Sequence, residues 1–500
     1  MIWLCNLDWL FSKIFSCIYQ RNNLPMEEEI FKDVVIIGNG PSGITLSYML
    51  AGNWPYYNGS THPIDFLNHR LQENKEKSIL EQDLDYLAEG LDGRSLNPVS
   101  VLYDTLVHPQ ADLGIDTPSV ISWKFDPLKA VNHVVIGRDD PGGSWQKMDK
   151  SALTLSHSSW MELPSLNIQD WDRNRIKLQS GLKQKRANVR TVANYYHSYV
   201  QSQGLSPYFL NRSVVTSVLP VEQDIAQALG FDKLWRVYGY TFVSDSSSTC
   251  KNFKYITPHV VLATGNSDKP NMLNVEGENL PFVSHSSSNL ETLIRNQKSP
   301  NKVSKLLIVG AGLSAADAVI TARFYGIPTI HVFRRSVCDP DLIFNKIPQD
   351  LYPEYYKVYQ MMQDSDHYEG YKAYSSSKIE CIKPNGRVMI NSCKHGKEIS
   401  VVNVSHVLVL IGRQPDLSYL PHKALKLGIN PDKSVDCKKN PVDINLYNHE
   451  SVFYPGIFAV GPLVGDNFVR FVQGGCLAVA SHVVKTKYES LLNCCATLSE

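Results

Sequence analysis

The chain has 500 residues, which is more than one compact core usually holds, so two or three domains are expected. Hydrophobic residues make up 43% and charged residues 20%, a composition typical of a soluble globular protein. Lysine plus arginine and aspartate plus glutamate both number 49, so the net charge is zero and gives no electrostatic reason to expect nucleic acid or an anionic membrane as a partner.

The first 30 residues are predicted to be an N-terminal extension, with apolar side chains recurring at helical spacing up to about residue 20. Asp8 and Lys13 interrupt this run, whereas a membrane-spanning helix needs about 20 mostly apolar residues. The pattern favours an amphipathic surface helix or a dispensable extension over a membrane anchor or a signal peptide.

The ten cysteines are scattered along the chain and form no CxxC or CxxxxC pair. This spacing is typical of reduced thiols in an intracellular, cytoplasmic protein and not of a disulfide framework. It also argues against a disulfide reductase with a paired-cysteine redox site. No metal site is predicted.

From residue 31 the pattern is a short apolar strand, a glycine loop and a helix. The strand covers 34–37, and the loop reads Gly38-Asn39-Gly40-Pro41-Ser42-Gly43. Gly38 permits a tight turn, Gly40 lets the backbone approach a pyrophosphate, and Gly43 allows close helix packing. A tight turn without a ligand is the alternative, but the strand before it and the helix after it favour a nucleotide site.

The segment 52–132 is much longer than a usual crossover connection, so we expect an insertion with structure of its own, including a helix from about 69 to 90. The sheet resumes at 133–136, and a turn with Gly142, Gly143 and Trp145 follows. Paired glycines let a backbone pass close to a flat ligand, and Trp145 can line that ligand. A surface turn with a buried tryptophan is the alternative.

A second strand, glycine loop and helix begins at 306–309. Its loop has the GxGxxA form, with Gly310, Gly312 and Ser314. The next strand, 328–333, ends at Arg334 and Arg335. An acid at this strand end would indicate NAD, whereas an arginine accommodates the 2′-phosphate of NADPH. Two solvated arginines are the alternative, but their register against the loop favours NADPH.

Three further apolar strands end in glycine, at Gly265, Gly412 and Gly461. The first two suit the crossings between a flavin domain and an inserted pyridine-nucleotide domain. The third leads into the turn Gly465-Asp466, where Asp466 and backbone N–H groups can face a flavin. A helix N-cap is an equally supported interpretation of Asp466.

These patterns predict an α/β protein with two Rossmann-like dinucleotide-binding domains, and their order resembles the three-layer arrangement of the flavoprotein monooxygenases. The predicted parts are the extension 1–30, a first FAD-binding part 31–265 that includes the insertion 52–132, an NADPH-binding domain 266–412, and a C-terminal FAD-binding part 413–490.

The order of the motifs resembles that of the class B flavin monooxygenases. More closely, the chain resembles the oxidative stress-induced growth inhibitor family, from about residue 31 to 484. Long blocks carry this resemblance, and the 52–132 insertion also looks like that family; the blocks are 34–52, 91–114, 158–166, 339–344, 351–362 and 461–475.

The resemblance implies an FAD- and NADPH-dependent monooxygenase that uses molecular oxygen and is linked to growth control, differentiation and cell death. The substrate, a small molecule or a protein, and any protein partners are left open. By motif, the residues implied at the FAD site are Gly38, Gly40, Pro41, Ser42, Gly43, Gly142, Gly143, Trp145, Gly265, Gly461 and Asp466, with Trp160 and Met161 as pocket wall. Those implied at the NADPH site are Gly310, Gly312, Ser314, Arg334 and Arg335.

Two departures from the class pattern affect the function. The acid that usually ends the second strand and binds the adenosine ribose is missing, because Ile136-Gly137-Arg138 stands there. Of the class fingerprint, His285 and Ser286 remain, so His285 is the candidate catalytic residue; a structural hydrogen bond is the alternative. The departures keep a second hypothesis open, a catalytically weak or inactive regulator that acts through protein partners.

Overall fold

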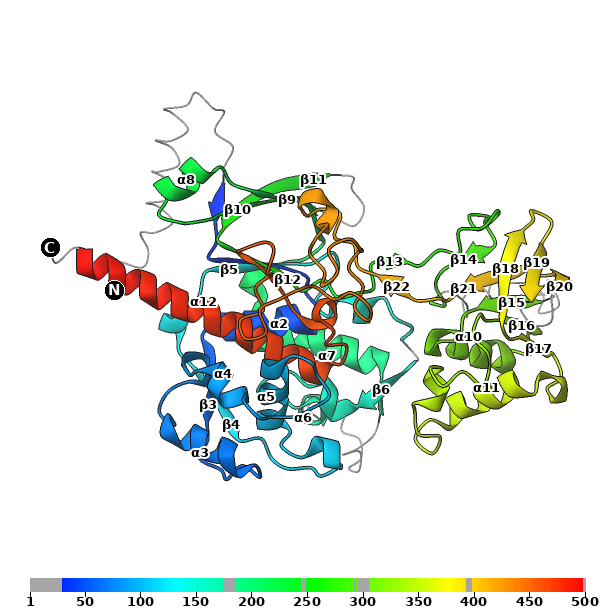
Figure 1. The fold of residues 1–500 in the computed structure, drawn as a ribbon, viewed down its shortest axis with the longest axis horizontal. Helices are drawn as coiled ribbons and strands as arrows, with labels where there is room; N and C mark the ends of the chain where they lie inside the picture. Colours follow the sequence, from blue (N-terminus) through cyan, green and yellow to red (C-terminus); the bar gives the residue numbers. More distant parts are fainter. Residues whose placement is uncertain are drawn as a thin grey trace. The chain divides into compact units, whose positions relative to one another are not determined.

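The computed structural model describes residues 29–150, 152–173, 186–243, 249–288, 290, 294, 305–392 and 398–497. The predicted N-terminal helix therefore lies outside the described residues. The chain forms two compact units, one of Met1–Asn266 with Pro415–Glu500 and one of Ser267–Gln414 (Figure 1). Within the described ranges, no helix combines the length and the apolar character that crossing a membrane requires.

The larger unit is built on a five-stranded parallel sheet in the order β23-β12-β2-β5-β8. Its central strands are short runs of valine, isoleucine and leucine, as expected of strands that are covered on both faces. The strands are β2 (Val34–Ile37), β5 (His133–Ile136), β8 (Phe209–Leu210), β12 (His259–Leu262) and β23 (Ile457–Ala459).

Alternate residues of β2 point to opposite faces of the parallel sheet. Val34 and Ile36 pack with the helices α2 (Pro41–Leu50) and α12 (Val469–Thr497). Val35 and Ile37 pack on an antiparallel layer of β9 (Ser213–Pro220), β10 (Trp235–Phe242) and β11 (Cys250–Thr257), with β1 (Ile30–Phe31) at its edge. Figure 1 shows this layer on one side of α12 and the helices of the insertion on the other.

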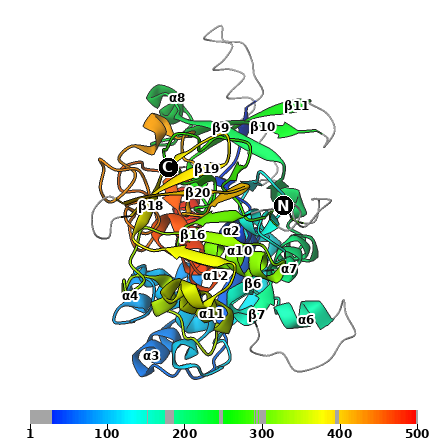
Figure 2. The ribbon, with the colours of Figure 1, turned by 90° about the vertical axis from the view of Figure 1, so that its right-hand side faces the viewer.

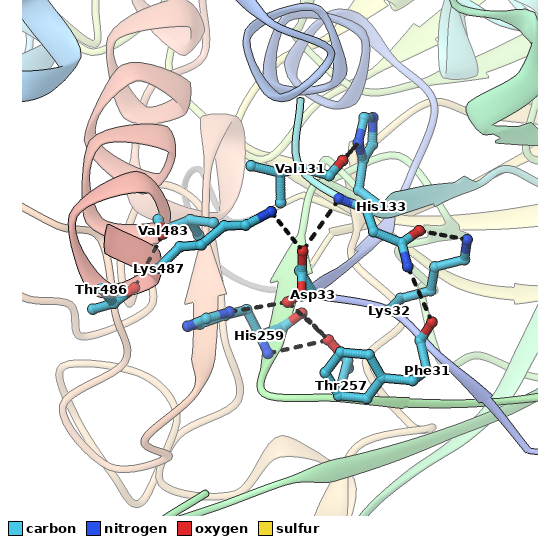
Figure 3. Close-up of polar contacts among 11 residues, drawn as sticks. Phe31, Lys32, Asp33, Val131, His133, Thr257, His259, Val483, Thr486 and Lys487 are labelled. Atoms are coloured by element: carbon cyan, nitrogen blue, oxygen red, sulfur yellow. Dashed lines mark hydrogen bonds and ion pairs between the residues drawn. The ribbon is translucent and has the colours of Figure 1, made fainter. Parts of the chain in front are cut away.

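A polar cluster around Asp33 fixes the N-terminal edge of the parallel sheet (Figure 3). The Lys487 ammonium of α12 lies 3.3 Å from the Asp33 carboxylate, which also accepts from the Asn132 backbone N–H at 3.2 Å. The Asp33 carbonyl accepts from the His259 ring at 3.0 Å and from the Thr257 hydroxyl at 3.2 Å. These contacts tie three strands and α12 together at the edge opposite the glycine loops.

The insertion carries a two-stranded sheet and several short helices. The strands are β3 (Asn53–Tyr57) and β4 (Ile121–Phe125), and the helices are α3 (Asp65–Glu73), η1 (Ile79–Glu81), α4 (Leu84–Ala88), α5 (Pro98–Val107), η2 (Ala111–Leu113) and η3 (Pro127–Lys129). The predicted single helix over 69–90 is wrong. Ser78 forms a capping box with Glu81, and Asp83 caps α4, so the chain starts a new turn twice within that range.

Between β5 and β8, the larger unit has further helices and a small two-stranded sheet. These are η4 (Gly143–Gln146), β6 (Leu153–His157), η5 (Ser158–Met161), α6 (Ile168–Arg173), β7 (Arg186–Asn188), α7 (Val189–Ser202) and η6 (Ser206–Tyr208). Tyr195, Tyr196 and Tyr199 of α7 donate hydrogen bonds to the carbonyls of Leu166, Met161 and Pro164. One buried helix therefore fixes the course of the whole segment 161–166.

The smaller unit repeats the nucleotide-binding pattern with a parallel sheet in the order β14-β21-β15-β16-β17. The helices α10 and α11 lie along one face of this sheet, and an antiparallel sheet of β18, β19 and β20 packs on the other (Figure 2). The elements are β14 (Val283–Ser284), β15 (Leu306–Val309), α10 (Leu313–Phe324), β16 (Thr329–Val332), η8 (Ile343–Asn345), α11 (Pro353–Gln363), η9 (Ser365–His367), β17 (Tyr371–Tyr374), β18 (Ser377–Ile382), β19 (Arg387–Ser392), β20 (Glu398–Asn403) and β21 (His406–Val409).

The start and the end of the smaller unit run side by side. There β13 (Lys269–Pro270) pairs antiparallel with β22 (Arg413–Gln414), and the Arg413 side chain donates to the carbonyls of Ser267 and Asp268. The remaining short helices of the larger unit are α8 (Gln223–Ala228), η10 (Pro421–Ala424) and η11 (Gly461–Val464).

Candidate nucleotide-binding sites

The first glycine loop joins the end of β2 to the start of α2. A Cβ on Gly38 would lie 2.3 Å from the Ala263 carbonyl oxygen, and one on Gly43 would lie 2.0 Å from the Gly38 carbonyl oxygen. Packing therefore requires glycine at both positions. Gly40 differs, because within the described chain no atom lies within 4 Å of the place a Cβ would take. This open space at the N-terminus of α2 fits a bound pyrophosphate.

The second pair of glycines lies directly against this loop. Gly143 has a φ of +57°, and a Cβ there would stand 3.0 Å from the Gly40 Cα. The Gly142 N–H donates to the Asn39 carbonyl at 2.8 Å, so the two turns contact each other through their backbones. The half-buried ring of Trp145 meets Tyr196 edge-on, with 6.0 Å between ring centroids.

The Asn39 side chain fills the space beside Gly137, at the strand end where the ribose-binding acid is missing. The Asn39 amide donates to the Asp139 carbonyl at 2.6 Å and to the Asn211 side chain at 3.0 Å. It lies so close to the end of β5 that a Cβ on Gly137 would be 2.0 Å from the Asn39 nitrogen. An acidic side chain at position 137 would collide with Asn39. Sequence reasoning missed this, because Asn39 occupies a position of the glycine loop where any residue type is allowed.

The two residues predicted as pocket wall have different surroundings. The Met161 side chain is buried in a core cluster with the tyrosines of α7. Trp160 is half-buried, and the Arg470 guanidinium lies over its ring at 4.5 Å from the centroid. Little of Met161 is left for a ligand, and the role of both residues at a cofactor stays a prediction.

The C-terminal turn also reaches the first glycine loop. Gly461 has a φ of +69°, and a Cβ there would lie 2.7 Å from the Ser42 hydroxyl. Gly265, at the end of β12, has a φ of +68°. The Asn266 amide that follows lies 3.5 Å from the Asn467 side chain and 3.1 Å from the Cys437 sulfur. The structure thus brings the predicted glycines of the larger unit together at one edge of the sheet.

Asp466 is bound by the insertion. Its buried carboxylate accepts hydrogen bonds from Ser95 at 2.5 Å, from Asn97 at 2.8 Å and from Ser100 at 2.7 Å. Burial raises the pKa of Asp466, and the three donors counteract this shift. Among the described residues, the carboxylate accepts only from these side chains, so it does not cap α12. Its predicted place beside the flavin stays a prediction.

In the second glycine loop, as in the first, one glycine is required by packing and another borders open space. A Cβ on Gly310 would lie 2.2 Å from the Leu410 carbonyl oxygen, whereas no described atom lies within 4 Å of the corresponding place on Gly312. Gly312 precedes α10, and Ser314 is exposed in the first turn of that helix. The loop therefore has open space beside the N-terminus of α10, as a bound dinucleotide requires.

His331 of β16 holds this loop in place. Its Nε2 donates to the Gly310 carbonyl at 2.6 Å, and its Nδ1 accepts from the Tyr371 hydroxyl at 2.7 Å. Burial lowers the pKa of His331 to about 4, so the ring is neutral and can make both bonds at once. The sequence offered only a histidine in an apolar strand, and nothing in that pattern pointed to the loop.

The two arginines after β16 are not equivalent. Arg334 is exposed, and in the described part of the chain it makes no ion pair. The Arg335 guanidinium lies 2.9 Å from Asp339 and 3.9 Å from Asp341. Arg334 therefore differs from Arg335 in having no carboxylate partner among the described residues, and the role of either at a 2′-phosphate stays a prediction.

His285, the candidate catalytic residue, has a protein partner. Its Nε2 lies 3.0 Å from the Glu278 carboxylate, which also accepts from the backbone N–H groups of Leu273 and Asn274. Burial alone would raise the pKa of Glu278, but these bonds outweigh it and lower the pKa. A catalytic role for His285 stays a prediction.

The geometry and the comparisons define the class of protein. The family model described as "Pyridine nucleotide-disulphide oxidoreductase" matches residues 246–461. The fold is similar to that of the bacillithiol disulfide reductase of Bacillus cereus, with a TM-score of 0.56 and 14% identity over 91% of this chain and 99% of that chain. It is also similar to ornithine hydroxylase of Pseudomonas aeruginosa, with a TM-score of 0.55 and 12% identity over the same shares. The predicted α/β class with two dinucleotide-binding domains is confirmed, and it is the fold of oxidoreductases that use FAD and NAD(P)H.

The chain belongs to the oxidative stress-induced growth inhibitor family, as its sequence blocks predict. It is 46% identical to "Oxidative stress-induced growth inhibitor 1" of Mus musculus over 460 residues, which cover 90% of this chain and 95% of that protein.

Proposed function

We propose that this chain is an FAD- and NADPH-dependent monooxygenase. The observation that carries the nucleotide-binding part of this proposal is shared by both glycine loops, and the monooxygenase chemistry is taken from the family resemblance. In each loop one glycine is required by packing, Gly38 or Gly310, while another, Gly40 or Gly312, borders open space at a helix N-terminus. Protein packing does not account for the second glycine, whereas a bound pyrophosphate does.

The residues of the larger unit would hold FAD between the first glycine loop, the Gly142-Gly143 turn and the C-terminal turn. Those of the smaller unit would hold NADPH, with Arg334 at the 2′-phosphate. FAD, when bound, supplies the electron transfer and the oxygen chemistry, and the protein binds, orients and excludes water. The half-buried ring of Trp145 and the ring of Trp160 under Arg470 would shield that site.

The name of the mouse relative connects that protein with growth inhibition under oxidative stress. We extend to this chain a role in growth control, differentiation and cell death, with a small molecule or a protein as substrate. We also propose a cytoplasmic location, because Cys250, Cys338, Cys381, Cys437 and Cys476 are free thiols.

The experiment follows NADPH and oxygen consumption by the purified full chain in air, with and without added FAD. The proposal expects NADPH oxidation that requires both FAD and oxygen. Oxidation that proceeds without oxygen when a disulfide is supplied would instead indicate a reductase. A chain that binds no FAD would leave a regulator that acts through protein partners.

A further inference from the structure

The insertion contacts the C-terminal turn through a short segment that begins at Ser95. Among the described residues, Ser95, Asn97 and Ser100 supply the hydrogen bonds to the Asp466 carboxylate, and the Asn97 amide also donates to the Val464 carbonyl at 3.2 Å. A buried carboxylate is costly unless it is hydrogen-bonded. The position of Asp466 therefore depends on residues that lie more than 360 positions earlier in the chain.

The same part of the insertion holds the first turns of α12. The Arg470 guanidinium, itself buried, pairs with Asp104 at 2.6 Å and with Asp112 at 2.7 Å. One turn further, α12 approaches α5 so closely that a Cβ on Gly474 would lie 2.3 Å from the Ser100 Cα. The start of α12 is thus both ion-paired with the insertion and closely packed against it.

The helix that the insertion holds also touches the first glycine loop. The Cys476 thiol lies 3.1 Å from the Ser42 carbonyl oxygen, and Gly461 leaves room for the Ser42 hydroxyl. A displacement of the C-terminal turn or of α12 would therefore be transmitted to the loop that begins α2.

We infer that the insertion 52–132 is a positioning element of the proposed FAD site, in which Ser95, Asn97 and Ser100 fix the C-terminal turn and the start of α12 against the first glycine loop. The inference rests on the proposed function and deepens it. It makes Asn97 and Ser100 positioning residues, because they act through Asp466 and not on the cofactor itself.

Three variants of the full chain test this. Asn97→Ala and Ser100→Ala each remove one donor to Asp466. Ser78→Ala is the matched control, because Ser78 is an equally buried serine of the insertion that donates its hydrogen bond elsewhere, to the Pro55 carbonyl at 2.8 Å. The readouts are the FAD dissociation constant, the melting temperature without FAD, and backbone hydrogen exchange of 461–475 without FAD.

Asn97→Ala and Ser100→Ala are each expected to raise the FAD dissociation constant at least tenfold and to speed backbone hydrogen exchange in 461–475. Ser78→Ala is expected to lower the melting temperature about as much as the other two variants do. It is expected to leave the FAD dissociation constant and the exchange in 461–475 unchanged. Equal changes in all three variants, or no change in exchange for Asn97→Ala and Ser100→Ala, would overturn the inference. A wild-type chain that binds no FAD would overturn the proposed function, whatever the exchange data show.

Discussion

Asn39 fills the space that a side chain at position 137 would need, since a Cβ on Gly137 would stand 2.0 Å from the Asn39 amide nitrogen. An acid at position 137 would therefore require the Asn39 side chain to leave its place. Gly137→Glu is expected to lower the melting temperature and to weaken FAD binding, instead of improving it as a restored ribose acid would. Asn39→Gly in the same chain removes the obstacle, so the double variant is expected to recover part of both losses. A Gly137→Glu single variant with wild-type stability and tighter FAD binding would contradict this account.

The first glycine loop offers a test that separates folding from ligand binding. Gly40 has a φ of −76° and open space beside it, so Gly40→Ala is expected to fold with a melting temperature close to that of the wild type. Its methyl group would occupy the place of the pyrophosphate, and FAD binding is expected to fall at least a hundredfold. Gly43→Ala is the contrasting variant, because its Cβ would collide with the Gly38 carbonyl and destabilise the unit. Calorimetry with FAD titration measures both; unchanged FAD affinity in Gly40→Ala would contradict the assignment.

Arg334 and Arg335 are expected to respond differently to substitution. A hydrogen bond to a charged group contributes roughly 1.5–3 kcal/mol, so Arg334→Ala is expected to weaken NADPH binding about tenfold or more and to leave NADH binding unchanged. Arg335→Ala serves as the control, since its guanidinium is already paired with Asp339. Titration of both variants with the two nucleotides measures this, and an NADPH affinity that depends on Arg335 and not on Arg334 would reverse the assignment.

Buried neutral histidines give both units a dependence on pH. Burial lowers the pKa of His331 and of His449 to about 4. In the unfolded chain these rings take up protons near pH 6.5, so the free energy of unfolding falls as the pH drops below that value. The loss between pH 7 and pH 5 is about 2 kcal/mol for each ring.

Asp104 and Glu162 have the opposite effect on the free energy of unfolding, which they raise as the pH falls. Burial raises the pKa of each carboxyl to about 7, so folding takes up protons. The contribution of a histidine is therefore measured as a difference between two chains. Urea unfolding of His331→Gln is expected to show a smaller loss of stability between pH 7 and pH 5 than the wild type. Identical losses in both chains would show that His331 does not contribute.

Local sequence patterns were sufficient for the two nucleotide-binding units. The apolar runs before Gly38 and Gly310 form parallel strands, and the residues after each loop form a helix, because strand, turn and helix are specified by neighbouring residues. The insertion differs, because the single helix predicted over 69–90 is wrong: Ser78 and Asp83 cap new helical turns within that range.

The contacts that determine the site are of another kind, since they join residues far apart in the chain. Asn39 meets Asn211 across 172 positions, and Ser95 meets Asp466 across 371. Such pairs follow from the order of the strands and from the packing of α5 on α12, and no local pattern encodes them. A sequence can show that Asp466 stands in a turn, but only the fold shows which side chains bind its carboxylate.

A monooxygenase of this kind must first use NADPH to reduce a bound flavin. The most direct measurement is the visible spectrum of the FAD-loaded full chain while NADPH is added without oxygen, followed by admission of air. The flavin absorbance is expected to fall with NADPH, to fall far less with NADH, and to return in air. A chain that retains no FAD, or a bound flavin whose spectrum does not respond to NADPH, would contradict the proposed function.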